Sequence, residues 1–300
     1  MGVRVHTVDE LHQKMGHISL TVIKWLIKQK IILGLELDVK SETSFCPTCS
    51  KAKPTRKPVP KEKVKYISQA LGDKIHSDMW GPVTPQSYNG KLYYMSFTNE
   101  YTRWTMIYCI SWTLEVLSKY KEYKAWMRTQ YGKCIKILQS DSGGEYLSKE
   151  FNTHLETQGT IRSLTVHDTP KENGVTEWLN HTLLEHVRAM LLTAQLPKNL
   201  WPETIHHAMW LKNRTSMGAL NGWPPYEVMH NAKPNLADLP DWGARVFVMK
   251  INAGKLENKG MEGFWLGYSG TSKGHPKYIP NQQIMVECNV SFKDTVRSSL

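Results

Sequence analysis

The sequence predicts an α/β core that follows a small helical module and precedes a β-rich tail. Within the core, apolar β-type runs and helical segments occur in the order strand, strand, strand, helix, strand, helix, strand, helix. Before the core, two histidines and a Cys-Pro-Thr-Cys group have the spacing of a metal site. We expect a module at 1–50, a linker at 51–67, a core at 68–235 and a β segment at 240–300.

Composition narrows the class of partner. The 300-residue chain has a formal net charge of +11 and a pI near 9.3, which favours a polyanion, nucleic acid before a membrane surface. No apolar run approaches the roughly 18 residues of a membrane span, and the start MGVRVHTVDELHQ lacks the pattern of a signal peptide. We therefore expect an intracellular protein, in which five cysteines favour metal or redox use over disulfides.

The first fifty residues contain a candidate zinc site. His12 and His17 are separated by four residues, and Cys46 and Cys49 follow a helical segment. Two imidazoles and two thiolates suit tetrahedral zinc, and a module this small has too little core without such a staple. Surface histidines beside an unrelated reduced CxxC are the alternative, and a redox site is disfavoured because no strand leads into the CxxC. The remaining cysteines stand alone in apolar surroundings, where we expect core positions: Cys109, Cys134 and Cys288.

The next segment, KAKPTRKPVPKEKVK, combines seven basic residues and three prolines with a single acid. Such a composition predicts a stiff, extended linker that cannot bury a core. It is either a solvated linker or an arm that follows phosphates and loses affinity with salt, and a nuclear-localisation role is also compatible with it. As an arm it would contact nucleic acid through Lys51, Lys53, Arg56 and Lys57.

The front of the core predicts an antiparallel hairpin and a helix. Two β-rich runs, KLYYMSFT and RWTMIYCI, are joined by NEYT. Thr113 is expected to cap the helix that follows, whose aromatic side chains belong to the core more often than to a base-stacking surface. A short helix from Ser148 and a strand at 161–166 complete this part of the pattern.

Three acids mark the candidate active site. Asp78 and Asp141 each end an apolar β-type run before a turn, and Glu177 lies in the first turn of a long amphipathic helix. Strand ends are where α/β enzymes place their chemistry. Two Mg²⁺ or Mn²⁺ ions about 4 Å apart need carboxylates from several elements. Each acid alone would be an ordinary solvated residue, but the three together predict a two-metal site.

The helix that carries Glu177 is predicted to be amphipathic. An apolar stripe runs along one side: Val175, Leu179, Leu183, Val187 and Met190. His181 and Arg188 lie toward the side of Glu177, where nucleic acid would run, and Asn173 forms the turn that sets the entry of the helix. Lys171 either contacts a phosphate or is solvated, and both alternatives stay open.

The tail contains short β-type runs, ARVFVMK, GFWLGYS, KYIP and QQIMVECNVSF, separated by glycines. This spacing predicts a small barrel, and the density of aromatic and β-branched residues argues against a disordered tail.

These motifs resemble a known family. Asp78, Asp141 and Glu177, with thirty-five residues between the last two, resemble the D, D-35-E signature of retroviral and retrotransposon integrases. The flanking SDSGGEY and TPKENGVTEWLNHTL resemble the Ty1/copia branch, the first module resembles its HHCC zinc module, and the tail resembles its SH3-like segment. The resemblance covers nearly the whole chain. It implies an RNase H-like core, a mixed five-stranded sheet with flanking helices, in a piece of a Gag-Pol polyprotein.

The resemblance also implies a reaction, DNA integration during transposition. Water attacks a phosphodiester near each end of the element's cDNA, and the exposed 3′-hydroxyl then attacks target DNA. The three acids would be the ligands of Mg²⁺ or Mn²⁺, zinc would be structural, and the protein would act in the nucleus as a homo-oligomer on DNA, with RNA a second candidate partner.

The chain departs from the copia pattern beside the acids. Where the helix usually reads E-R-x-N-R, this chain has Trp178 and His181 in place of the two arginines, and Ser142 replaces the usual Asn after Asp141. These changes leave the metal ligands intact and remove positive charge. They favour a degenerate or domesticated nucleic-acid-binding protein as the alternative to a working integrase, and a zinc-dependent binding module with an unrelated core is a third hypothesis.

Overall fold

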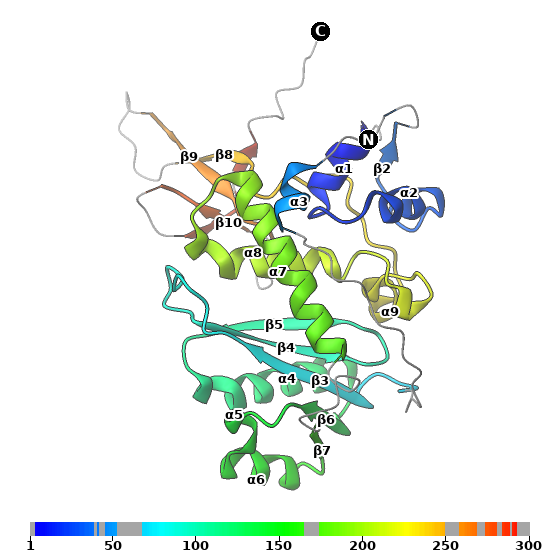
Figure 1. The fold of residues 1–300 in the computed structure, drawn as a ribbon, viewed down its shortest axis with the longest axis vertical. Helices are drawn as coiled ribbons and strands as arrows, with labels where there is room; N and C mark the ends of the chain where they lie inside the picture. The colour runs from blue at the N-terminus through cyan, green and yellow to red at the C-terminus, as the bar shows by residue number, and fades with distance from the viewer. Residues whose placement is uncertain are drawn as a thin grey trace. The chain divides into compact units, whose positions relative to one another are not determined.

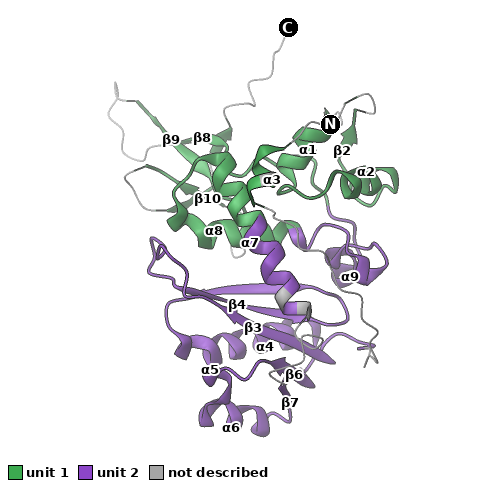
Figure 2. Cartoon of the chain, in the orientation of Figure 1, with its two compact units in different colours: residues 1–52, 186–211, 235–300 green, residues 53–185, 212–234 purple. Residues whose placement is uncertain are grey.

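The structure is a computed structural model. It describes residues 4–38, 41, 46–52, 68–164, 174–249, 258–268, 274–280, 284–288 and 290–292. The chain divides into two compact units, unit 1 of residues 1–52, 186–211 and 235–300, and unit 2 of residues 53–185 and 212–234 (Figure 2). These units cut across the boundaries expected from the sequence, which remain predictions.

Unit 2 is built on a five-stranded mixed sheet with the order β5-β4-β3-β6-β7 (Figure 1). Its strands are β3 (Lys74–Trp80), β4 (Tyr93–Asn99), β5 (Thr105–Ile110), β6 (Ile137–Ser140) and β7 (Ile161–Leu164). The first three strands pair antiparallel, β6 pairs parallel with β3, and β7 pairs parallel with β6. This arrangement confirms the hairpin that the sequence predicted and the RNase H-like core that the family resemblance implied.

Helices accompany this sheet. They are η1 (Thr113–Glu115), α4 (Val116–Tyr131), α5 (Gly144–Leu147), α6 (Lys149–Thr157), the first part of α7 (Gly174–Ala194), η3 (Gly218–Leu220) and α9 (Pro225–His230). Thr113 starts a 3₁₀ turn, and the expectation that it caps the helix is wrong. Instead, the Glu115 carboxylate accepts the backbone N–H groups of Ser111 and Trp112 at 2.8 and 3.0 Å. A carboxylate at this point satisfies amides that have no partner inside the helix.

The two faces of the sheet differ in chemistry, because side chains alternate along each strand. Ile75 and its neighbour Leu138 face α4, where the Tyr123 ring stacks on Phe97 with centroids 4.7 Å apart. The opposite face carries polar groups. Thr98 and Thr105 join their hydroxyls there at 2.8 Å. The helix α4 thus covers the apolar face, while on the opposite face the polar side chains of His76, Ser96 and Gln139 are also buried.

Unit 1 combines the N-terminal segment, helices from the middle of the chain and the C-terminal sheet. The N-terminal and middle elements are β1 (Arg4–His6), α1 (Val8–Lys14), α2 (Leu20–Lys28), β2 (Leu35–Leu37), α3 (Pro47–Ala52), the end of α7, η2 (Lys198–Leu200) and α8 (Trp201–Lys212). The strands of the C-terminal sheet are β8 (Arg245–Met249), β9 (Gly260–Trp265), β10 (His275–Tyr278), β11 (Met285–Glu287) and β12 (Val290–Phe292). They pair antiparallel in the order β11-β10-β9-β8-β12. This sheet confirms the predicted SH3-like segment.

The apolar side chains of the N-terminal segment do not form a core of their own. Leu11 and Met15 share one hydrophobic cluster with Leu211 of α8 and with Val246 and Trp265 of the C-terminal sheet. Burying each of these side chains contributes about 1.5–3 kcal/mol. The core that a fifty-residue module lacks is therefore supplied from distant parts of the chain.

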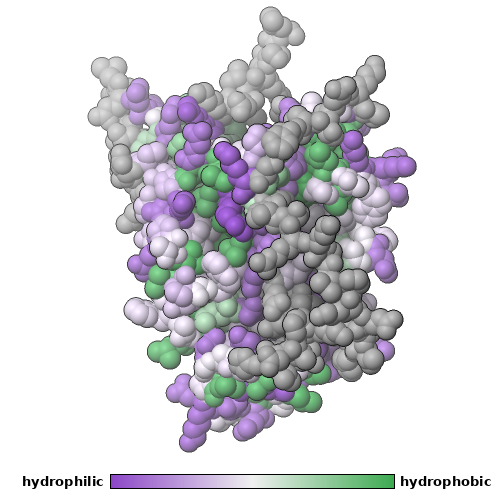
Figure 3. Space-filling model, viewed as in Figure 1, coloured by the Kyte–Doolittle hydropathy of each residue, from purple (hydrophilic) through white to green (hydrophobic). Residues whose placement is uncertain are grey.

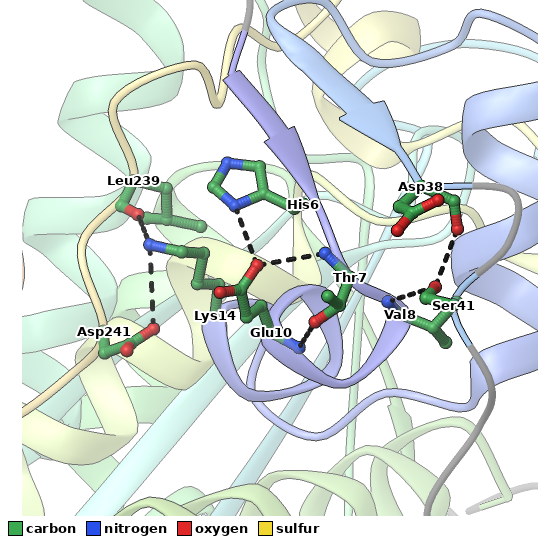
Figure 4. Close-up of polar contacts among 9 residues, drawn as sticks. All are labelled: His6, Thr7, Val8, Glu10, Lys14, Asp38, Ser41, Leu239 and Asp241. Carbon is green, nitrogen blue, oxygen red and sulfur yellow. Dashed lines mark hydrogen bonds and ion pairs between the residues drawn. The ribbon is translucent and has the colours of Figure 1, made fainter.

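Polar contacts fix α1 within this unit (Figure 4). The Thr7 hydroxyl accepts the Glu10 backbone N–H at 3.2 Å while the Glu10 carboxylate accepts the Thr7 N–H at 3.0 Å, which forms a capping box. At the other end, Lys14 Nζ donates to the Leu239 carbonyl at 3.0 Å and lies 3.8 Å from the Asp241 carboxylate. Both ends of the helix that carries His12 are thus tied down.

The surface bears on two further expectations. Cys134 and Cys288 are exposed and Cys109 is half-buried, so placing these cysteines in the core is wrong for the first two. Each exposed cysteine lies in a connection just beyond a regular element.

On the face seen in Figure 3, hydrophilic and hydrophobic side chains of the described residues are interspersed, as on most folded proteins. Within the described part of the chain, no helix has the length and apolar character that crossing a membrane requires.

Candidate functional site

The predicted His/Cys group comes together in unit 1. His12 lies in the last turn of α1, and His17 follows in a turn where its own φ is +59° and that of Gly16 is +68°. Cys46 and Cys49 lie at the start of α3. The four ligand atoms lie within 4.8 Å of one another, and both histidines are buried. The structure thus brings together all four residues that the spacing selected.

The distances suit a tetrahedral ion. His12 Nε2 lies 3.2 Å from His17 Nδ1 and 3.1 Å from Cys49 Sγ, and His17 Nδ1 lies 3.5 and 3.6 Å from the sulfurs of Cys46 and Cys49. Bond lengths of about 2.0 Å to nitrogen and 2.3 Å to sulfur in a tetrahedron give separations of about 3.3 Å between nitrogens and about 3.5 Å from nitrogen to sulfur. The donor set and its geometry therefore suggest zinc.

The second nitrogen of each imidazole is also engaged. His12 Nδ1 lies 2.7 Å from the Ile18 carbonyl oxygen, which holds the ring with Nε2 toward the group. His17 is turned the other way, with Nδ1 toward the group and Nε2 3.1 Å from the Thr193 hydroxyl. Such outer hydrogen bonds fix the tautomer and orientation of histidines that bind metals.

The register of the unit 2 sheet places two of the three acids side by side. Strands β3 and β6 pair in parallel with His76 opposite Gln139. This is the last recorded pair, and extending the same register by two residues along each strand sets Asp78 level with Asp141. Neighbouring strands lie about 4.8 Å apart. Both acids are half-buried, and the alternation of side chains assigns both to the polar face.

Asn180 connects helix α7 to this face. Its Nδ2 donates to Asp78 Oδ2 at 2.7 Å, and its Oδ1 accepts the Tyr94 hydroxyl at 2.9 Å. Because Tyr94 donates to the oxygen, the amide is held with its NH₂ group toward Asp78. Burial, with a smaller contribution from Asp78, raises the pKa of Tyr94 far above its usual value, so the phenol keeps its proton. Asp78 is thus oriented by a chain of two hydrogen bonds.

The backbone of α7 brings the position of Glu177 to the same place. Position 177 is one helical turn before Asn180, and residues three apart share one face of a helix. The side chain of Glu177 lies outside the described parts of the chain. The three acids thus come from β3, from the end of β6 and from the first turn of α7.

Asp141 has local support. The backbone N–H of Gly143 donates to Asp141 Oδ1 at 3.1 Å, which fixes the turn after β6. Behind the strands, the Ser77 and Tyr146 hydroxyls are joined at 2.7 Å. Burial raises the pKa of Tyr146 well above its usual value, so the phenol keeps its proton.

The predicted nucleic-acid contacts are only partly described. Lys51 is exposed on α3, and His181 and Arg188 are exposed on α7, with His181 Nδ1 lying 3.5 Å from the Glu185 carboxylate. The other five predicted contacts lie outside the described residues: Lys53, Arg56, Lys57, Lys171 and Asn173. Their roles remain predictions.

Sequence reasoning missed two residues of the acidic site. Asn180 was open to discovery, because its spacing of three from Glu177 puts it on the same helical face. Tyr94 had no such signal, since its contact with Asn180 spans 86 residues. Spacing in the sequence predicts which residues share a face of one helix, but it does not predict contacts between elements that are distant in the sequence.

Comparisons with known proteins find similarity in the tail and along most of the chain. Residues 244–299 match the family described as the retroviral polymerase SH3-like domain. The chain is 28% identical over 292 residues to the retrovirus-related Pol polyprotein from transposon TNT 1-94 of Nicotiana tabacum, and the match covers 96% of this chain. It covers 22% of the polyprotein, so the chain spans about a fifth of that relative's length.

Two solved structures are similar to the chain at lower identity. One is the HTLV-2 integrase catalytic core domain in complex with magnesium, at 17% identity and a TM-score of 0.41, covering 54% of this chain and 99% of that one. The other is the simian T-cell lymphotropic virus intasome in complex with the PP2A regulatory subunit B56 gamma, at 14% identity and a TM-score of 0.46, covering 80% and 87%. The sequence matches, the strand order and the His/Cys group confirm that the chain resembles the integrase region of copia-type retrotransposon Pol polyproteins.

Proposed function

We propose that this chain is a retrotransposon integrase that catalyses DNA 3′-end processing and strand transfer with divalent metal ions. One observation supports this above the others. The register sets Asp78 level with Asp141 on one face of the sheet, and Asn180, one turn after Glu177, binds Asp78. Hard cations such as Mg²⁺ and Mn²⁺ select carboxylate oxygens, which Asp78, Asp141 and Glu177 would supply from three elements.

The role of each residue follows from its position. A bound pair of Mg²⁺ or Mn²⁺ ions would activate the attacking oxygen and stabilise the leaving oxygen of a phosphodiester. Asp78, Asp141 and Glu177 would supply the ligand oxygens. Asn180 and Tyr94 keep the Asp78 carboxylate in one orientation, and the Gly143 amide does the same for Asp141. Fixed ligands lower the cost of assembling the site around DNA.

The zinc site has a separate role. His12, His17, Cys46 and Cys49 would hold one Zn²⁺ that links α1 to α3, far from the acids in sequence. Such closed four-ligand sites contribute to folding and leave no position open for substrate. Zinc is therefore structural in this proposal, and DNA chemistry belongs to unit 2.

DNA is the proposed substrate, at the ends of the element and at the target. The net charge of +11 favours a polyanion, and exposed cations such as Lys51 and Arg188 would contact phosphates. A homo-oligomer would hold two DNA ends, as the resemblance to integrases implies, and the nucleus would be its place of action.

A second candidate is a DNA-binding protein that no longer joins strands. It is favoured by the residue that follows Glu177. Trp178 is 52% exposed, and the Lys212 ammonium lies 4.6 Å from its ring centroid. A bulky aromatic residue stands where related sequences place an arginine, so one phosphate contact beside the acids would be lost.

The experiment that separates the two candidates is strand transfer by the purified chain on short blunt duplexes, with Mn²⁺ and at low salt. Wild-type protein is expected to give joined products, and Glu177→Gln, which keeps the size but removes the charge, is expected to give none. DNA retention is measured in parallel on both proteins. Retention without products from wild type would refute the integrase and favour the second candidate.

A further inference from the structure

Thr193, in the last turn of α7, lies beside the zinc group. Its Oγ1 is 3.1 Å from His17 Nε2, a contact between residues 176 positions apart. His17 presents Nδ1 to the other ligand atoms. An imidazole that binds a metal through Nδ1 carries its proton on Nε2, so this nitrogen donates to the Thr193 hydroxyl.

The same hydroxyl also reaches the cysteine side of the group. Thr193 Oγ1 lies 3.5 Å from Thr48 Oγ1, and Thr48 stands between Cys46 and Cys49 in α3. Thr193 can therefore accept from His17 and donate to Thr48 at once, because a hydroxyl offers one proton and two lone pairs. One side chain of α7 touches both the histidine turn and the cysteine turn.

The histidine turn is fitted closely to neighbouring helices. A Cβ added at Gly16 would lie 3.0 Å from the Leu211 side chain of α8 and 4.0 Å from the His186 ring of α7. His17 itself is buried. The turn can therefore shift little without losing contacts, and the orientation of the His17 ring depends on what these two helices present to it.

We propose that Thr193 is a positioning residue of the zinc site, so that zinc binding and the packing of the α7 end against the N-terminal segment are coupled. The inference rests on the proposed zinc site and adds to it a partner residue that lies more than 140 positions downstream of Cys49. Coupling is reciprocal, so zinc should stabilise the packed end of α7 by the same free energy with which that packing favours zinc.

The test measures zinc affinity of the full chain by competition with a chromogenic chelator. Outer-shell partners change metal affinity by about 10–100-fold. Because Thr193 is exposed and water can replace part of its contact, Thr193→Val is expected to weaken zinc by about tenfold, at the lower end of that range. Thr193→Ser keeps the hydroxyl and is expected to bind zinc within about twofold of wild type. Hydrogen exchange of residues 186–194 should slow when zinc binds, and less in the valine variant.

The outcomes are distinct. Weak binding by the valine variant with rescue by serine supports the proposal. Equal affinity of wild type and valine overturns it and leaves the four-ligand site intact. Weak zinc binding by both variants also overturns the proposal, because the serine variant keeps the hydroxyl and the loss of affinity would then come from a change in the packing of the helix. Absence of zinc binding by wild type would refute both the zinc site and the role of Thr193.

Discussion

Replacing Asn180 with leucine tests the hydrogen-bond chain that orients Asp78. The substitution keeps the approximate size of the side chain and removes both contacts of the amide. A hydrogen bond to a charged group contributes about 1.5–3 kcal/mol, and a buried hydroxyl left without an acceptor costs about 1–3 kcal/mol. Since leucine recovers part of this through apolar packing, we expect the free energy of unfolding to fall by about 3 kcal/mol.

Tyr94→Phe completes the test as a double-mutant cycle. Alone it removes one neutral hydrogen bond and should cost about 1 kcal/mol. In the Asn180→Leu protein the Tyr94 hydroxyl has already lost its acceptor, so removing it should cost nothing or stabilise. The double variant is therefore expected to be more stable than the sum of the single effects by about 1–2 kcal/mol.

The assay is urea unfolding of the four proteins under identical buffer conditions. Asn180→Asp serves as a further variant, since it keeps the shape of the side chain and places a second carboxylate beside Asp78. It should be less stable than Asn180→Leu and should regain stability when Mn²⁺ is added. If the changes in the free energy of unfolding were additive within about 0.5 kcal/mol, Tyr94 and Asn180 would not act together, and the hydrogen-bond chain to Asp78 would be refuted.

Three further predictions concern stability. Burial raises the pKa of Glu203 to about 7 from its usual 4.5, so the free energy of unfolding of the wild type should fall as pH rises between these values. In urea unfolding, Glu203→Gln should be more stable than the wild type above pH 7 and equally stable below about pH 4.5. A difference in stability that does not change with pH would contradict this. Gly72→Ala should lower the free energy of unfolding by at least about 3 kcal/mol, because φ is +92° and the new Cβ would lie 2.5 Å from the Cys134 carbonyl oxygen. Gly132→Ala, at φ +62° with open space among the described residues, should lower it by about 1 kcal/mol. Equal losses of stability for the two variants in thermal unfolding would refute the close contact at Gly72. Zinc removal by a chelator should speed hydrogen exchange in β8 and β9 as well as in α1, because the N-terminal segment shares its core with Trp265, and an unaffected sheet would show that the core is not shared.

The sequence identified most of the residues whose chemistry is local. His12, His17, Cys46 and Cys49 could be paired by spacing, because a metal site requires a fixed set of donors. The succession of strands and helices along the core followed from the periodicity of apolar residues, and the mixed sheet followed from the family resemblance. The position of Asp141 at the end of a strand followed from the glycines after it.

Contacts between distant segments could not be predicted in this way. Tyr94 and Thr193 have no pattern that points to Asn180 or His17, since only the folded chain brings them together. The shared core of the N-terminal segment and the C-terminal sheet is of the same kind. Cys134 was misjudged because apolar neighbours in sequence do not decide burial just beyond the end of a helix.

Asp141 is proposed to be a ligand of the catalytic metal ions and not a residue that contacts DNA. The most direct measurement compares wild type with Asp141→Asn for Mn²⁺-dependent cleavage of a duplex that represents an element end, alongside retention of the same duplex. Cleavage is expected to be abolished while retention stays within about twofold, since the variant removes a charge from the metal site and leaves the basic residues in place. Equal loss of cleavage and retention, or cleavage that survives the substitution, would contradict it.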